Sequence, residues 1–248
     1  MNDFVIVIPS RYASTRLPGK PLREINGKTM LEHVHERAQE SAAREVVIAT
    51  DDERIAEAAE AFGGQVCMTG DQHRSGTERI AEVCDLRDWP VDTIVVNLQG
   101  DEPTMPAALI DQCAELLLQS TADIATLASP IASQQDFENP NVVKVVLADN
   151  GDAIYFSRAA IPYGRAESPP VDAKSAALHH HGIYAYRCGV LRRLVTSEPS
   201  DLEVCEQLEQ LRALSLGMTI RVAIPNERPG AGVDTEEDLV TAAAQLAR

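Results

Sequence analysis

The chain has 248 residues, of which 44% are hydrophobic, 24% are charged and 4% are aromatic, and its formal net charge is −16. This length fits one domain, or one domain that carries a smaller lobe. The acidic balance excludes a general nucleic-acid binder, because the repulsion between protein and phosphates would go uncompensated. It does not exclude a triphosphate ligand, since basic residues are concentrated in one short stretch, at Arg11, Arg16, Lys20 and Arg23.

Five cysteines lie far apart in the chain and form no C-x-x-C pair: Cys67, Cys84, Cys113, Cys188 and Cys205. An odd, scattered set of this kind indicates buried apolar thiols in a reducing compartment. The first apolar run, residues 4–8, is too short for a signal-peptide core or a membrane span. We therefore expect a cytoplasmic protein that does not cross a membrane.

Strands and helices are predicted to alternate through the first half of the chain. Continuous apolar, mostly β-branched runs predict buried strands at 4–8, 45–50, 92–98 and 123–127. The spacing of apolar residues predicts helices at 29–42, 52–62, 77–86 and 106–118. This alternation predicts an α/β fold with a mostly parallel sheet.

The pattern changes from about residue 141. Two strand-like runs, 142–147 and 153–156, flank Asp149-Asn150-Gly151, which is a hairpin signal. The remaining expectations are a Pro-, Ser-, Ala- and Gly-rich surface loop at 163–177, strands at 179–186 and 219–224, a helix at 202–214 and a terminal helix starting at Thr235 or Asp234. We expect a single domain, 1–248, with an inserted, partly antiparallel lobe at about 141–200.

The first loop, PSRYASTRLPGK at 9–20, follows a predicted buried strand. It therefore lies at the carboxyl edge of the sheet, where open α/β folds bind ligands. Its backbone N–H groups, with Arg11, Arg16 and Lys20, can hold phosphates. The loop is not a Walker A motif, and the chain has no G-x-G-x-x-G, which argues against NAD chemistry. A solvated basic linker is the alternative interpretation, but four basic residues at that place in an acidic chain favour phosphate binding.

Two aspartates are candidate ligands for a divalent cation. Asp101 directly follows the predicted strand at 92–98, where a carboxylate can hold Mg²⁺ that bridges triphosphate oxygens. Asp234 lies in GAGVDT at 230–235, where glycines allow the backbone to approach a ligand closely. Each has a plainer interpretation: Asp101 and Glu102 can cap the helix after Pro103, and Asp234 can cap the last helix. Together with a phosphate loop, the two aspartates favour a shared metal site.

Two histidine-containing segments give weaker signals. HRSGTER at 73–79 precedes a predicted helix and offers the hydroxyls of Ser75 and Thr77 to a nucleobase or ribose. A plain capping box is the alternative interpretation, and Thr77 itself would be a good cap. The run HHH at 179–181 suggests zinc, but adjacent residues on a strand point to opposite faces and cannot converge on one ion. A sugar-binding role for the one inward-facing histidine, or simple surface exposure, explains the run better.

These segments, taken together, resemble one known family. The motifs are PSRYASTRLPGKPL, HRSGTERIAE, VNLQGDEP, NPNVVKVV, YFSRAAIPY, HHHGIYAYR, QLEQLRAL and GVDTEEDL, in this order from residue 9 to residue 239. Their order and spelling are similar to those of the 3-deoxy-manno-octulosonate cytidylyltransferases, the CMP-KDO synthetases. The resemblance covers nearly the whole chain, and it implies a Rossmann-like nucleotidyltransferase core.

The resemblance implies transfer of CMP from CTP to KDO in lipopolysaccharide precursor synthesis, with release of pyrophosphate, a Mg²⁺ cofactor and a homodimer formed largely through the inserted lobe. Carried over motif by motif, Arg11, Lys20, Asp101 and Asp234 would be catalytic, and Asp101 and Asp234 would hold Mg²⁺. The nucleotide would contact the following residues: Arg11, Arg16, Lys20, Ser75 and Gln99. The sugar pocket would be lined by a further set: Arg158, His180, Tyr184, Glu209 and Gln210.

Three other functions compete with this one. The nearest is a cytidylyltransferase for sialic acid or another nine-carbon acid, which shares the style of the opening loop. A non-catalytic sugar-nucleotide binder is disfavoured by the full set of Arg11, Lys20, Asp101 and Asp234. A dehydrogenase is disfavoured by the missing glycine fingerprint. The sequence also shows no constellation for a protein nucleophile, which favours direct in-line attack by the sugar hydroxyl on the α-phosphorus.

Overall fold

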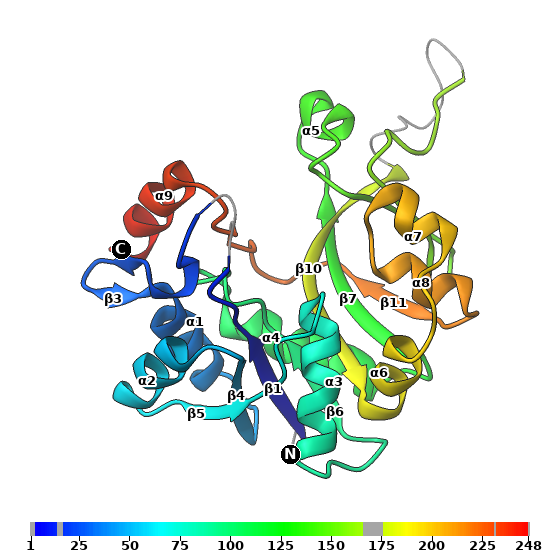
Figure 1. Cartoon of the computed structure of the whole chain (residues 1–248). Helices are drawn as coiled ribbons and strands as arrows, with labels where there is room; N and C mark the ends of the chain where they lie inside the picture. Colours follow the sequence, from blue (N-terminus) through cyan, green and yellow to red (C-terminus); the bar gives the residue numbers. More distant parts are fainter. Residues whose placement is uncertain (1–2, 14–16, 166–175, 231, 248) are drawn as a thin grey trace.

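The computed structural model describes residues 3–13, 17–165, 176–230 and 232–247 of the chain (Figure 1). Arg16, which was expected to bind the nucleotide, lies outside the described residues, as does most of the expected loop at 163–177. Among the described residues, no helix is long and apolar enough to cross a membrane.

One large mixed sheet organises the described part of the chain. Its strands are β1 (Phe4–Pro9), β4 (Glu45–Thr50), β5 (Gln65–Met68), β6 (Ile94–Asn97), β7 (Ile124–Pro130), β8 (Lys144–Leu147), β9 (Ala153–Ser157), β10 (Leu178–Arg187) and β11 (Ile220–Ala223). They run in the order β11-β7-β10-β6-β1-β4-β5, and β8 pairs with both β10 and β9. Pairing is parallel from β6 through β1 and β4 to β5 and again between β11 and β7, whereas β10 pairs antiparallel with its neighbours.

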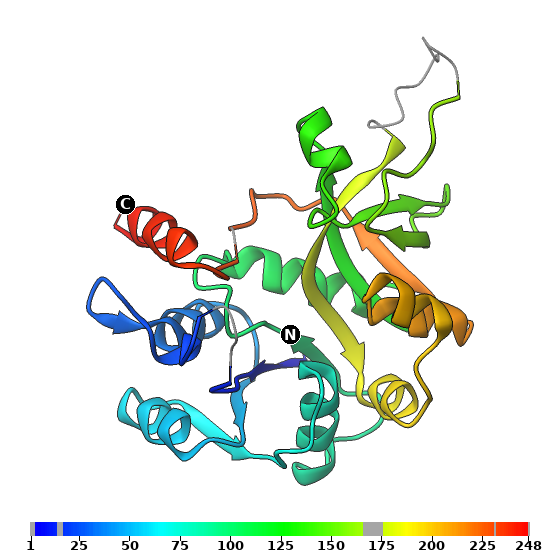
Figure 2. The same cartoon turned by 45° about the horizontal axis from the view of Figure 1, so that its top comes forward.

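Helices cover both faces of the sheet. They are η1 (Lys20–Leu22), α1 (Met30–Gln39), α2 (Glu53–Ala61), α3 (Gly76–Leu86), α4 (Ala107–Leu118), α5 (Gln134–Glu138), α6 (Cys188–Val195), α7 (Asp201–Glu206), α8 (Gln210–Ser215) and α9 (Glu236–Leu246). The α/β class expected from the alternating pattern is confirmed. Figures 1 and 2 show α5 and the adjoining ends of β7 and β10 projecting beyond these helical layers.

The side chains of β1 explain the layering, because successive residues of a strand point to opposite faces. Val5 and Val7 belong to a buried cluster with residues of α3, α6 and α8. Phe4, Ile6 and Ile8 belong to a second cluster with residues of α1, α2 and α4. All five side chains are fully buried. A continuous apolar run is therefore needed at this strand, as the sequence predicted.

The hairpin expected around Asp149-Asn150-Gly151 is confirmed. β8 and β9 pair antiparallel, and Gly151 turns the chain with φ of 85°, a conformation that favours glycine. Through β10 these strands extend the main sheet, so β8, β9 and β10 are continuous with the core. The role of 141–200 as a sugar-binding and dimerisation lobe stays a prediction.

The prediction of one helix at 202–214 is wrong, because two short helices, α7 and α8, take its place. The chain breaks at Gln207, which adopts the left-handed conformation with φ of 54° and ψ of 48°. The break directs Leu208 into the core, where it is buried, and Glu209 becomes the N-cap residue of α8. Periodicity alone did not reveal this turn, because apolar residues continue at helical spacing on both sides of it.

Several short elements were not predicted from the sequence. The hairpin of β2 (Glu24–Ile25) and β3 (Lys28–Thr29) turns at Asn26 and Gly27, whose φ values are 51° and 84°. That Asn-Gly pair is a strong turn signal in retrospect. The helix α6 starts directly from the end of β10 and packs against α3.

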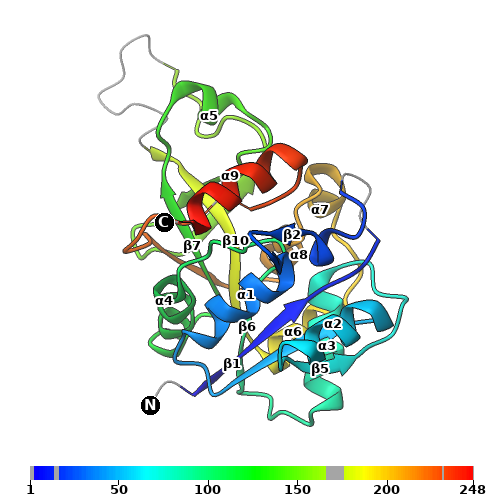
Figure 3. The same cartoon turned by 90° about the vertical axis from the view of Figure 1, so that its left-hand side faces the viewer.

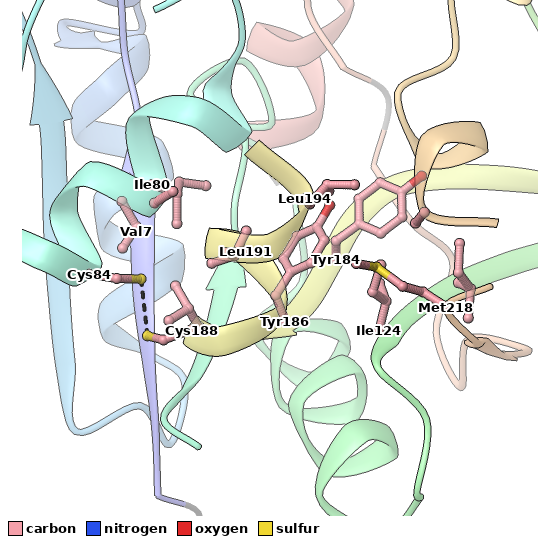
Figure 4. Close-up of a cluster of buried hydrophobic side chains, with 14 of the residues drawn as sticks. Val7, Ile80, Cys84, Ile124, Tyr184, Tyr186, Cys188, Leu191, Leu194 and Met218 are labelled. Atoms are coloured by element: carbon pink, nitrogen blue, oxygen red, sulfur yellow. Dashed lines mark hydrogen bonds between the residues drawn. The ribbon is translucent and has the colours of Figure 1, made fainter. Parts of the chain in front are cut away.

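The cysteines are all free, as expected for a reducing compartment. Four are buried, but Cys205 is exposed, so the expectation of uniformly buried thiols is wrong for this residue. Within the core, Cys188 Sγ donates to Cys84 Sγ over 3.0 Å, between α6 and α3 (Figure 4).

The left-handed turn at Gln207 gives a stability prediction. Replacing Gln207 by Gly should raise the free energy of unfolding by about 0.5–1 kcal/mol, because glycine has no Cβ to be strained at positive φ. Urea denaturation measures this change. Gln207→Ala is the control, since alanine keeps the strained Cβ, and equal stabilisation by both variants would contradict the assignment.

Candidate active site

The first loop leaves the carboxyl end of β1, as the sequence predicted. Ser10 N–H donates to Ala49 O at the end of β4, which fixes the start of the loop on the sheet. At its other end, Gly19 adopts φ of 65° and the chain enters η1, the short 3₁₀ turn that begins with Lys20. Lys20 is thereby placed at the edge of the sheet with its side chain half-buried.

The Lys20 ammonium joins two carboxylates from distant parts of the chain. Its Nζ lies 2.6 Å from Asp101 Oδ2 and 2.8 Å from Asp234 Oδ1. Burial lowers the pKa of Lys20, but the charges of Asp101 and Asp234 and the hydrogen bonds to them outweigh this effect and leave the pKa raised. The lysine therefore carries a positive charge at neutral pH, and the two aspartates face one cation.

The plainer interpretation of both aspartates as helix caps is wrong. The helix α4 begins only at Ala107, with Pro106 at its N-cap. The helix α9 is capped by Thr235, which forms a capping box with Asp238. Thr235 thus takes the capping role, and Asp234 directs its carboxylate to Lys20.

Backbone contacts bring the C-terminal segment onto the turn that carries Asp101. Val233 N–H donates to Asp101 O over 2.9 Å. Close packing requires glycine here, since a Cβ on Gly230 would lie 2.6 Å from Thr104 O. A small apolar cluster joins the C-terminal segment to the first loop, β2 and the start of α1: Leu17, Ile25, Met30, Val233, Leu239 and Ala242. Figure 3 shows α9 close to α1 and β2, the elements that share this cluster.

A cavity of about 270 Å³ opens beside this ion-pair centre. Its lining includes Arg11 and Lys20 from the first loop, Ser75 from the start of α3, and Gln99 and Asp101 from the turn after β6. The structure therefore brings the described nucleotide-binding candidates to one cavity.

Ser75 connects this cavity to one of the sugar candidates. Its hydroxyl is the N-cap of α3, accepting from Glu78 N–H, so the expectation that Thr77 caps this helix is wrong. Ser75 Oγ and Thr77 Oγ1 each donate to the Glu209 carboxylate over 3.1 Å. Burial raises the pKa of Glu209 against the opposing effect of these two hydroxyls. Gln210 follows directly as the first residue of α8.

The Arg158 guanidinium joins two other segments of the chain through their backbone carbonyls. Its Nε donates to Glu206 O over 2.7 Å, Nη1 to Pro140 O over 3.1 Å and Nη2 to Gln207 O over 3.3 Å. The carbonyls of Glu206 and Gln207 are available because α7 ends there. The break in the predicted helix therefore positions this guanidinium.

The three consecutive histidines divide between two faces of β10, as the period of a strand requires. The rings of His179 and His181 lie 4.9 Å apart on one face. On the other, the His180 ring packs against Phe156 and Tyr184, and its Nε2 lies 3.1 Å from Thr126 Oγ1. The inward histidine is therefore His180.

Two buried polar groups near these candidates have no hydrogen-bond partner among the described residues. One is the hydroxyl of Tyr184, next to His180. The other is Glu102 Oε2, beside Asp101. Burial, followed by the charge of Asp101, raises the pKa of Glu102 to about 8. The sequence interpretation considered Glu102 only as a cap, although its position next to Asp101 was a signal of a site role.

The environment of His180 gives a prediction for acid stability. Burial, followed by the neighbouring histidines, lowers the pKa of His180 to about 3. The unfolded chain therefore takes up a proton near pH 6.5 while the folded chain does not, so stability is lost as pH falls from about 6.5 towards 3.

The free energy of unfolding of the wild type should fall between pH 7 and pH 5. In His180→Gln this decrease should be smaller by about 1–2 kcal/mol, because glutamine does not titrate. Urea titrations of both proteins at each pH measure the slope. His35→Gln is the comparison, since burial lowers the pKa of His35 as well, but no other histidine contributes to that shift. If the free energy of unfolding depended on pH in the same way in wild type and His180→Gln, His180 would take up its proton equally well in the folded and unfolded chains, which would contradict the prediction.

Known proteins with similar sequence or structure identify the family. A sequence model of the cytidylyltransferase family matches residues 5–220. The structure of a CMP:2-keto-3-deoxy-manno-octonic acid synthetase complexed with CTP is 41% identical, covers 99% of this chain and 98% of its own, and superposes with a TM-score of 0.88.

Two more distant structures share the fold alone. A cytidylyltransferase from Leptospira borgpetersenii serovar Hardjo-bovis (strain JB197) is 20% identical, covers 100% of this chain and 87% of its own, and has a TM-score of 0.63. A 4-diphosphocytidyl-2C-methyl-D-erythritol synthase from Anaerococcus prevotii DSM 20548 is 14% identical, covers 100% and 97%, and also has a TM-score of 0.63. On the strength of the family match and the full-length relative, this chain belongs to the cytidylyltransferase family and, within it, to the CMP-KDO synthetases.

Proposed function

We propose that this protein transfers CMP from CTP to the anomeric hydroxyl of KDO, giving CMP-KDO and pyrophosphate. The observation that carries the proposal is the meeting of Lys20, Asp101 and Asp234 beside a cavity that Arg11, Ser75 and Gln99 also line. The full-length relative, a synthetase of this type in complex with CTP, supports both substrates.

The proposed cofactor is Mg²⁺, with Asp101 and Asp234 as its protein ligands. The donor set fits, because both carboxylates already converge on a single cation, the Lys20 ammonium. Mg²⁺ prefers oxygen ligands and is commonly bound through one or two carboxylates together with substrate phosphates and water. When bound, such an ion would polarise the α-phosphate and help to acidify the attacking hydroxyl.

The basic residues of the first loop are proposed to bind the triphosphate. Arg11 and Lys20, with Arg16 nearby in sequence, would neutralise the β- and γ-phosphates and stabilise the pyrophosphate as it leaves. Ser75 and Gln99 would contact the cytidine. The anomeric hydroxyl attacks the α-phosphorus in line, the bond to pyrophosphate breaks, and the hydroxyl proton is lost to solvent. Catalysis then rests on positioning and on charge stabilisation, without a protein nucleophile.

The sugar is proposed to bind near Arg158, His180, Tyr184, Glu209 and Gln210. Glu209 supports this, because it contacts the hydroxyl of Ser75 at the edge of the nucleotide cavity. Arg158 uses three of its five N–H donors on backbone carbonyls, which leaves two, as far as the described residues show, for the carboxylate of an acidic sugar. The hydroxyl of Tyr184, which has no partner within the described part of the chain, would supply a further hydrogen bond. We further propose a homodimer, cytoplasmic location and a role in lipopolysaccharide precursor synthesis, all on the family resemblance.

A pyrophosphate-release assay with CTP, Mg²⁺ and a panel of acidic sugars tests the activity. KDO should give turnover, and sialic acid should give little. Faster turnover with sialic acid would assign the chain to the rival substrate class. Binding of CTP in a calorimeter without pyrophosphate release from any sugar would favour a non-catalytic binder.

The metal assignment predicts the behaviour of two isosteric variants. Asp101→Asn and Asp234→Asn should each lower turnover by about a hundredfold, or roughly 3 kcal/mol in the barrier, because one charged contact is removed. Each should also weaken binding of Mn²⁺ measured by electron paramagnetic resonance in the presence of CTP. Asp92→Asn, at an exposed position, is the control. Unchanged Mn²⁺ affinity in both variants would reject these aspartates as ligands.

A further inference from the structure

Tyr12 lies in the first loop but faces away from the nucleotide cavity. Its neighbours Arg11 and Ala13 line the cavity, as does Ser10, whereas Tyr12 does not contribute to the lining. The Tyr12 side chain instead packs against the apolar cluster beneath α1 and α2. The loop therefore presents its charged side chain to the ligand and uses the aromatic ring to contact the protein.

An arginine covers one side of this ring. The guanidinium carbon of Arg54, on α2, lies 3.4 Å from the centre of the Tyr12 ring, which is a cation–π contact. Asp52 fixes the orientation of this guanidinium, because its carboxylate accepts from Arg54 Nε over 2.9 Å and from Nη2 over 2.6 Å. Asp52 is itself the N-cap of α2 and accepts from Arg54 N–H over 3.0 Å. The ring is thus connected to the rigid start of a helix.

The same ring lies directly against Gly19. A Cβ built on Gly19 would meet Tyr12 Oη at 3.2 Å and Cζ at 3.3 Å, so a larger residue there would press on the ring. Gly19 also has φ of 65°, and its carbonyl accepts from Leu22 N–H to close the turn that carries Lys20. The contact between Tyr12 and Gly19 therefore sets the position of the backbone immediately before Lys20.

We propose that Tyr12, held by Arg54 and Asp52, is a positioning residue that fixes Gly19 and thereby aims Lys20 and Arg11 at the triphosphate of CTP. The proposal rests on the proposed function. Tyr12 follows Arg11 directly in sequence, and its ring lies against Gly19, which directly precedes Lys20. Removing the ring would take away this contact between the two described ends of the loop, so that the backbone beside each cation is held less firmly before the ligand binds.

Tyr12→Ala tests the inference, with Tyr12→Phe as the conservative partner. Tyr12→Ala should raise KM for CTP by about tenfold, with kcat lowered less than threefold and KM for KDO unchanged, because a misplaced loop weakens nucleotide binding. Tyr12→Phe keeps the ring and should stay within twofold of wild type. Tyr163→Ala, which removes a ring that is 88% exposed, is the matched control.

A double-mutant cycle with Gly19→Ala isolates the contact. In the wild-type background this change adds the clash with Tyr12 and the strain of positive φ, whereas in Tyr12→Ala only the strain remains. The effect of Gly19→Ala on KM for CTP should therefore be at least threefold smaller when Tyr12 is already Ala, about the size expected for residues in contact. If the double variant raised KM for CTP by the product of the two single effects, the proposal would be overturned. A KM for CTP in Tyr12→Ala within twofold of wild type would also overturn it.

Arg54→Ala provides a variant that leaves the loop residues intact. It should raise KM for CTP by about threefold, the size expected for an exposed cation–π contact. Arg44→Ala removes another exposed arginine with a carboxylate partner, Asp3, and is its control. If Tyr12→Ala does not fold, as judged by circular dichroism, an unchanged KM in Arg54→Ala overturns the inference. Failure of the proposed function is distinct, because the wild type itself would then release no pyrophosphate from CTP with KDO.

Discussion

The ion-pair centre of Lys20 with Asp101 and Asp234 is the interaction on which the candidate site depends. It joins three segments that are far apart in sequence: Lys20 is separated from Asp101 by 81 positions and from Asp234 by 214 positions. Two carboxylates facing each other would repel unless a cation lay between them. Lys20 supplies that cation, so the two carboxylates stay together.

The sheet makes this meeting possible. The parallel strands β1, β4 and β6 end at one edge, and the turns that follow them carry Lys20 and Asp101. The antiparallel strand β10 joins this half to β7 and β11, and it brings the segment with Tyr184 alongside Asn97. Nucleotide and sugar candidates are thus arranged around neighbouring strands of a single rigid sheet. In a protein with a net charge of −16, the basic residues Arg11, Arg16, Lys20 and Arg23 are concentrated in the stretch of sequence that follows β1, and the proposed anionic substrates would bind at this edge.

Much of this arrangement follows from simple patterns. The buried run of β1 and its loop, the strand before Asp101 and the hairpin around Gly151 were predictable, because each depends on local spacing and turn chemistry. The proximity of Asp234 to Lys20 and Asp101 was not predictable from periodicity, because no periodic pattern connects residues so distant in sequence. The glycines before Asp234 and the family resemblance gave the only signal. The cap at Ser75 is local and follows the S-x-x-E pattern of 75–78, whereas the break at Gln207 depends on burial of Leu208 in the core. The carbonyl partners of Arg158 could not be predicted for the same reason, because they exist only where that break ends a helix.

The second carboxylate of the centre comes from the segment that precedes the last helix. During translation, the strands, the first loop and Asp101 all leave the ribosome before Asp234 does. A nascent chain can therefore form most of its sheet while Lys20 has only one acidic partner and α9 has not yet covered Leu17 and Met30. The ion pair between Lys20 and Asp234 therefore forms only after the sheet and the first loop have left the ribosome.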